Sequence, residues 1–134
     1  MDKKRKARRG AGIPGLPEIR GGESTAAIQS KVRAYFSALR AFWKAAGIEV
    51  DTVDGDAQLA RLVAILRVQG SRGLGSVEGR TAGGMLQLPA RVFDLKARGY
   101  EIISSREWAW GADGLRHPNT ARYTLLKEPG GANA

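Results

Sequence analysis

The chain has no cysteine and only one histidine among its 134 residues. Without cysteine it can form neither a disulfide nor a thiolate metal site, which fits a reducing compartment, and we expect a cytoplasmic protein. His117 alone can build neither a metal site nor a Ser/His/Asp set, and the glycine-rich GSRGLGSVEG lacks the Lys-Ser/Thr ending of a phosphate-binding loop. We therefore expect no enzyme, no cofactor and no metal.

Long apolar runs are missing as well. No stretch approaches the roughly 18 apolar residues that a membrane span requires, and the charged N-terminal MDKKRKARRG is not followed by the apolar segment of a secretory signal. We expect a soluble protein that does not enter a membrane.

Acidic residues are scarce beside basic ones: 13 Asp and Glu face 22 Lys and Arg, for a net charge of +9. Residues 1–22 carry a net +5, residues 23–56 a net −1 and residues 57–134 a net +5. A balance of this kind attracts polyanions through sequence-independent electrostatics, and nucleic acid is the first candidate partner.

Residues 1–22 combine this charge with five glycines and two prolines, a composition that favours a disordered basic arm. Its clustered cations are candidate phosphate contacts: Lys3, Lys4, Arg5, Lys6, Arg8 and Arg9.

A long amphipathic helix is predicted over residues 24–46, capped by Ser24 and ended by Gly47. Its apolar residues recur at steps of four and three: Ile28, Val32, Tyr35, Leu39 and Phe42, with Phe36 and Trp43 widening the stripe. Such a stripe can close the core of its own domain, or it can serve as a homodimer seam. The first alternative is favoured because three heptads are short for an independent coiled coil.

Turn-like residues 48–56 lead to a second helix, which we expect to start at Asp56 and to end near Gln69. A glycine-rich break, a weakly helical SVEGRTAGG and a turn at Gly83 and Gly84 follow. The next helix, over residues 86–98, has Pro89 in its first turn and ends at Gly99; its core face is Leu88, Val92 and Leu95.

Beyond Gly99 the pattern indicates two strands, residues 100–110 and 120–128, joined by turn-forming residues 111–119. The final residues 129–134 read as a flexible tail. The order of helix, short helix, turn, helix and hairpin is that of a winged helix-turn-helix. The expected fold is therefore mainly α with a β-hairpin (α+β), preceded by one long N-terminal helix that with its linker spans residues 23–56.

The run LPARVFDLKARGYEI, followed by a hairpin and closed by ARYTLL, resembles small winged helix-turn-helix domains of bacteria and bacteriophages. The resemblance covers about residues 57–127, and we expect the winged helix-turn-helix domain over residues 57–128; the glycine-rich GLGSVEGRTAGG departs from the usual second helix. It implies double-stranded DNA as partner and a transcriptional regulator as function, with residues 86–98 as recognition helix and the 100–128 hairpin as wing.

Four polar residues form an outer stripe on the predicted recognition helix: Gln87, Arg91, Asp94 and Arg98. Arginine reads guanine and glutamine reads adenine, so Gln87, Arg91 and Arg98 are candidate base contacts. Asp94 can instead hold either arginine in an ion pair.

The hairpin adds Arg116, which we place with His117 at the tip as a phosphate contact. Trp108 and Trp110 can stack on unpaired bases, which would favour RNA, or one or both can cover the core or the 24–46 helix. The alternatives to a DNA-binding regulator are an interaction or assembly protein that uses the fold as a scaffold, and a nonspecific nucleic-acid binder.

Overall fold

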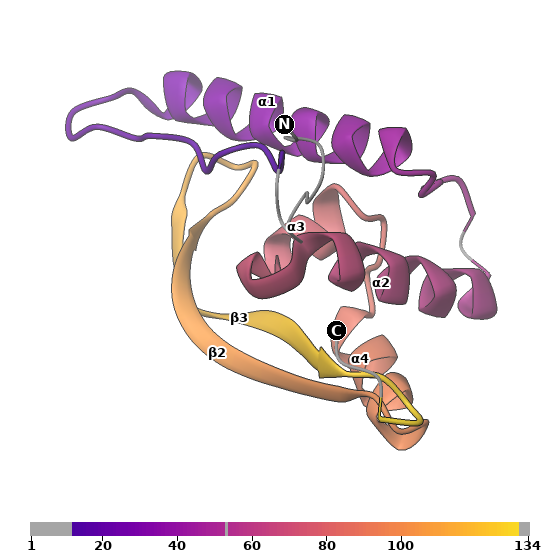
Figure 1. The fold of residues 1–134 in the computed structure, drawn as a ribbon. Helices are drawn as coiled ribbons and strands as arrows, with labels where there is room; N and C mark the ends of the chain where they lie inside the picture. The colour runs from indigo at the N-terminus through magenta and orange to yellow at the C-terminus, as the bar shows by residue number, and fades with distance from the viewer. Residues whose placement is uncertain (1–11, 53, 132–134) are drawn as a thin grey trace, which may run out of the picture.

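The computed structural model describes residues 12–52 and 54–131 (Figure 1). Four α-helices, a 3-10 turn and three strands follow one another in these ranges. Their bounds are α1 Thr25–Ala45, α2 Gly55–Gln69, η1 Gly70–Arg72, β1 Leu74–Gly75, α3 Ser76–Thr81, α4 Leu88–Ala97, β2 Glu101–Trp110 and β3 Arg116–Lys127. The predicted α+β class, with a long N-terminal helix before a winged helix-turn-helix, is confirmed.

Helix α1 follows the sequence prediction closely. The Ser24 hydroxyl accepts a hydrogen bond from the Ala27 amide at 3.1 Å, and the chain leaves the helix through Gly47 with φ +85°. Its stripe is buried against the rest of the chain: Ile28, Val32, Tyr35, Phe36, Leu39 and Trp43. The stripe therefore closes the core of the monomer.

This burial corrects the homodimer alternative. Four of the five proposed seam residues are buried inside one chain, namely Ile28, Val32, Tyr35 and Leu39, and Phe42 packs partly buried against the same core. Polar contacts hold the helix there as well: Trp43 Nε1 donates to Gln69 Oε1 at 3.0 Å and Arg40 Nε donates to the Ala82 carbonyl at 3.1 Å. A dimer built on this seam would first have to open the monomer.

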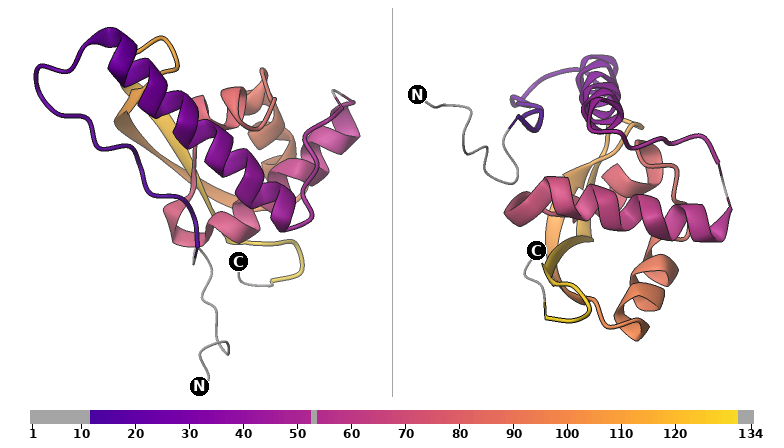
Figure 2. Two further views of the ribbon diagram at one scale, coloured as in Figure 1. Left: turned by 90° about the horizontal axis from the view of Figure 1, so that it is seen from above. Right: turned by 45° about the vertical axis from the view of Figure 1, so that its right-hand side comes forward.

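Helix α2 lies between α1 and α4 (Figure 1 and the right view of Figure 2). Its N-cap is Asp54, whose carboxylate accepts from the Ala57 amide at 3.2 Å, and not Asp56 as the sequence suggested. Buried Arg61 donates to the carbonyls of Glu49, Thr52 and Gly83. One guanidinium thus ties the α1–α2 loop to the α3–α4 turn, and its burial lowers its pKa.

Helix α3 is short, as its glycines suggest, but Gly79 has a packing role. A Cβ at this position would lie 2.6 Å from Leu88 Cδ2 and 3.2 Å from Leu74 Cδ2. Only glycine lets α3 approach the first turn of α4 so closely. The glycine content that departs from the family pattern is therefore part of the contact between the two helices.

The sheet is antiparallel with the order β1-β3-β2, so β3 is its central strand. Strand β3 begins at Arg116, which pairs with Trp110, and the connecting loop is only residues 111–115. The predicted loop 111–119 was too long because Pro118 and Asn119 read as turn residues. Asn119, with φ +57°, lies where the register shifts between Glu107 and Ala109, so the turn chemistry marks an irregularity within a strand.

The segment before α1 differs in part from the predicted disordered arm of residues 1–22. Ile13 and Ile19 pack partly buried against the core, and Lys31 of α1 donates to the Glu18 carbonyl at 2.9 Å. The six clustered cations of the arm lie outside the described residues.

Candidate nucleic-acid interface

Helix α4 rests on the core through Leu88, Val92 and Leu95, as predicted. Pro89 stands in its first turn, and Gly99, with φ +97°, ends it and turns the chain into β2. Figures 1 and 2 show α4 on the side of α2 opposite to α1. The long N-terminal helix therefore leaves the outer surface of α4 uncovered.

The flank of α4 that carries Arg91 faces α2. The Arg91 guanidinium pairs with Asp94 at 3.3 Å, only 24% of its side chain is exposed, and its Nη1 lies 3.5 Å from the Cβ position of Gly55 at the start of α2. Arg98 lines a groove between α2 and α4 together with Asp56 and Arg67. The ion pair with Asp94 that the sequence offered as an alternative to base contact is thus present for Arg91.

The opposite flank of α4 is apolar at its centre. Phe93 is 71% exposed, and Leu86, just before the helix, is 68% exposed. Lys96 is exposed one turn further along, and Gln87 is exposed at the N-cap. Sequence reasoning missed Phe93 and Leu86 because it looked for hydrogen-bonding side chains. The sequence does contain a signal for them, because both are apolar residues that do not lie on the helix face formed by Leu88, Val92 and Leu95.

An open groove of about 540 Å³ runs between α3, the α3–α4 turn and the end of the hairpin. Ser76 and Arg80 line it from α3, Leu86 from the turn, and His117 and Thr120 from β3. His117 pairs with Asp113 at 2.9 Å, and the Leu115 amide together with His117 lowers the pKa of that carboxyl. The groove separates the helix-turn-helix from its wing.

Several cations on α3, α4 and the hairpin have no acidic partner in the part of the chain that the structure describes, and one of them, Arg80, lines this groove. Within residues 12–52 and 54–131, Arg80, Lys96 and Arg98 are exposed and take part in no ion pair, and Arg106 donates only to the Asn119 carbonyl at 3.3 Å. In contrast, Lys31 and Arg67, on other surfaces, pair with Glu23 and Glu128. Uncompensated positive charge is thus present on α3, α4 and the hairpin, and α1, within the same ranges, also carries two exposed cations without an ion pair, Arg33 and Lys44.

The hairpin loop is held against the first turns of α1. Gln29 Nε2 donates to the Asp113 carbonyl at 3.1 Å. Gly114, with φ +81°, sits so close to α1 that a Cβ would lie 2.8 Å from the side chains of Thr25 and Gln29. The wing is therefore braced by the N-terminal helix, although its strands curve away from α1 toward α4 (Figure 1).

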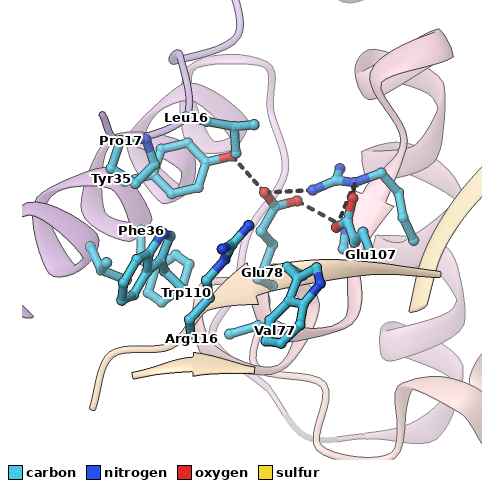
Figure 3. Close-up of a pocket in the computed structure, with 14 residues that line it drawn as sticks. Leu16, Pro17, Tyr35, Phe36, Val77, Glu78, Glu107, Trp110 and Arg116 are labelled. Carbon is cyan, nitrogen blue, oxygen red and sulfur yellow. Dashed lines mark hydrogen bonds and ion pairs between the residues drawn. The ribbon is translucent and has the colours of Figure 1, made fainter. Parts of the chain in front are cut away.

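The sequence placed Arg116 at the hairpin tip, whereas in the structure Arg116 is the first residue of β3 and pairs with Trp110 next to the loop. Its guanidinium carbon lies 4.9 Å from the ring centroid of Trp108, which is 57% exposed, whereas Trp110 is partly buried against the core. These side chains line a pocket of about 220 Å³ together with Tyr35 and Phe36 of α1 (Figure 3). The expectation that one or both tryptophans cover the core or the 24–46 helix holds for Trp110, which packs against the core.

One wall of this pocket is a polar network that joins four elements (Figure 3). Tyr35 of α1 donates to Glu78 of α3 at 2.6 Å, and Arg122 of β3 bridges Glu78 at 3.1 Å and Glu107 of β2 at 2.9 Å. Burial alone would lower the pKa of Arg122, but the two carboxylates raise it above its ordinary value. The network fixes α1, the helix-turn-helix and the wing relative to one another.

Neither a metal centre nor a membrane span is present in the part of the chain that the structure describes. No group of three or more His, Cys, Asp or Glu side chains there is arranged to hold a metal ion. No helix in residues 12–52 and 54–131 has the length and apolar content to cross a membrane.

The comparison with protein families matches residues 57–128 to the model described as a winged helix-turn-helix domain. The match covers more than half of the chain and spans α2, α3, α4 and the hairpin. The chain belongs to this family. Comparisons with curated proteins and with solved structures found no match. Winged helix-turn-helix domains bind DNA through a recognition helix, so membership supports a nucleic-acid-binding role in general terms and confirms the resemblance read from LPARVFDLKARGYEI.

Proposed function

We propose that this winged helix-turn-helix protein is a DNA-binding transcriptional regulator, with α4 as the recognition helix and the β2–β3 hairpin as the wing. The observation that carries the proposal is the open outer surface of α4, beside a groove whose surrounding elements bear the unpaired Arg80, Lys96 and Arg106. A free helix flanked by positive charge has the form that enters a major groove between two phosphate backbones.

The candidate base contacts differ in how ready they are to act. Gln87 is exposed at the N-cap of α4 and Arg98 is exposed at its C-cap. Arg91 can contact a base edge only after its ion pair with Asp94 is broken, so the free energy of that ion pair is subtracted from any base contact that Arg91 makes. Arg116 is exposed on the wing and supplies charge toward phosphate.

The basic arm adds a sequence-independent part to the proposed function. Lys3, Lys4, Arg5, Lys6, Arg8 and Arg9 place six positive charges within seven residues. Each phosphate that they neutralise releases counterions, and this release favours binding to any duplex. Specificity would then depend on α4 and affinity largely on the arm.

The test is selection of bound sequences from a random DNA duplex pool with the full chain at near-physiological salt. A regulator enriches a motif, and its affinity for that motif exceeds its affinity for scrambled duplex at the same salt concentration. An unrelated polyanion such as heparin serves as the control. Equal affinity for motif, scrambled duplex and heparin would contradict base readout.

A second candidate is an interaction or assembly protein that uses the winged helix as a scaffold. The exposed Phe93 and Leu86 favour it, because protein interfaces have apolar centres. In that case the selection yields no motif, and Phe93→Ala leaves duplex affinity unchanged. A nonspecific RNA binder is less well supported, since the exposed ring of Trp108 is already stacked by Arg116.

A further inference from the structure

We propose that Phe93, with Leu86 beside it, reads the 5-methyl group of thymine in the major groove, so that the target sequence carries thymine opposite the centre of α4. The inference rests on the proposed DNA-binding function and adds the chemical group that the helix recognises. Its starting point is that the two most exposed large apolar side chains in residues 12–52 and 54–131 are Phe93 and Leu86.

The geometry of α4 separates its polar readers from its apolar surface. With Leu88, Val92 and Leu95 on the core, about 100° per residue places Arg91 and Arg98 on one flank, and Phe93 and Lys96 on the other. The first flank faces α2, as the contact of Arg91 with Gly55 shows. The second flank points away from α2.

The second flank continues into the groove beside the wing. Leu86, which directly precedes the N-cap of α4, lines this groove together with Arg80 of α3 and Thr120 of β3. A duplex that lies along α4 and touches the wing must cross this groove. It would then meet Leu86 and Phe93 before it meets the arginines that face α2.

The chemistry of this flank excludes most forms of base readout. Phe93 and Leu86 have no hydrogen-bond donor or acceptor in their side chains, and the charged Lys96 follows on the same flank. Among the base edges in the major groove, the thymine methyl is the apolar group, and phenylalanine is one of the side chains that contact it. Lys96 is then placed for a neighbouring guanine or a phosphate.

The experiment uses the full chain and the duplex enriched by selection. Each thymine is replaced in turn by deoxyuridine, which removes only the 5-methyl group and keeps the hydrogen-bonding pattern. Dissociation constants are measured by fluorescence anisotropy for wild type, for Phe93→Ala and for Leu126→Ala. Leu126 is a matched control, since it is also an exposed apolar side chain but lies on β3 near the end of the strand.

For wild type and for Leu126→Ala we expect deoxyuridine to weaken binding about fourfold at one or two positions, the loss that follows from exposing one buried methyl group. Phe93→Ala should bind the thymine duplex more weakly and should not distinguish thymine from deoxyuridine at those positions. Circular dichroism should show an unchanged fold, because the Phe93 ring lies outside the core.

Two results would overturn the inference. One is a wild type that enriches a motif but is indifferent to every deoxyuridine replacement. The other is a Phe93→Ala variant that keeps the full deoxyuridine penalty. A wild type that binds no duplex above the level of heparin overturns the proposed function, and this inference with it, so the two failures can be told apart.

Discussion

The Tyr35 hydroxyl donates a hydrogen bond of 2.6 Å to Glu78 Oε2, and through it the helix that precedes the matched domain is joined to the helix-turn-helix. Arg72 donates to the same hydroxyl at 2.6 Å, so Tyr35 is both donor and acceptor in a buried site. The phenol group of Tyr35 is therefore one of the polar contacts that attach α1 to the winged domain, beside the hydrogen bonds of Trp43 to Gln69 and of Arg40 to Ala82.

Tyr35→Phe should reduce the free energy of unfolding by about 1–3 kcal/mol, because it leaves a buried carboxylate and a guanidinium each with one partner fewer. The measurement is urea unfolding at neutral pH. The control is Phe36→Leu, which changes the shape of a neighbouring core side chain and removes no polar atom. It should leave the contacts of Tyr35 with Glu78 and Arg72 intact. A loss no larger than that of the control would show that the bond contributes little.

The same residue predicts a pH dependence. Burial, followed by the charge of Glu78, raises the pKa of Tyr35 above its ordinary value of about 10. Above that pH the unfolded chain releases the tyrosine proton while the folded chain keeps it, so stability falls as the pH rises past about 10. The decline between about pH 9 and 11 should be smaller in Tyr35→Phe. Parallel curves for the two proteins would contradict a raised pKa.

Leu39→Ala should cost about 2–5 kcal/mol of unfolding free energy, because Leu39 of α1 is fully buried in the core. Ser37→Ala, an exposed change on the same helix, should be nearly neutral. Sedimentation should find wild type monomeric. A dimeric wild type that becomes a folded monomer on Leu39→Glu substitution would restore the seam as an interface.

Gly114→Ala should detach the hairpin loop from α1, since the new methyl would meet Thr25 and Gln29 at 2.8 Å. Gly130→Ala has an equally left-handed φ of +89° but no atom within 4 Å, so it isolates the cost of the backbone conformation alone. We expect Gly114→Ala to be the more destabilising and to increase hydrogen exchange in residues 111–115. Equal effects would mean that the loop does not depend on α1.

Replacement of the six clustered cations of the arm by glutamine should flatten the slope of log affinity against log salt by up to about 5, at roughly 0.9 for each phosphate that is no longer neutralised. Motif preference should persist, because α4 is unchanged. The comparison variant replaces Lys31 and Lys44 of α1, on the side of α2 away from α4, and should leave the slope unaltered. An unaltered slope in the arm variant would place the arm away from DNA.

The sequence predicted the elements because their signals are local. Ser24, Pro89, Gly47 and Gly99 act through their own backbone or their neighbours', and the apolar periods of α1 and α4 follow from the pitch of a helix. The hairpin loop was misjudged because Pro118 and Asn119 favour a turn by themselves, while the pairs on either side of them, His117 with Ala109 and Thr120 with Glu107, keep them within β3.

Composition and periodicity thus determined by themselves that this is a basic chain of helix, helix-turn-helix and hairpin. Tertiary structure decided which surface each stripe meets. The stripe of α1 closes the core because α2, α3 and the hairpin offer it a complementary apolar face, a fact that no single helix encodes. Arg91 turns to Asp94 and α2 while Phe93 turns outward, since helix periodicity gives the angle between two side chains but only packing gives the direction of either.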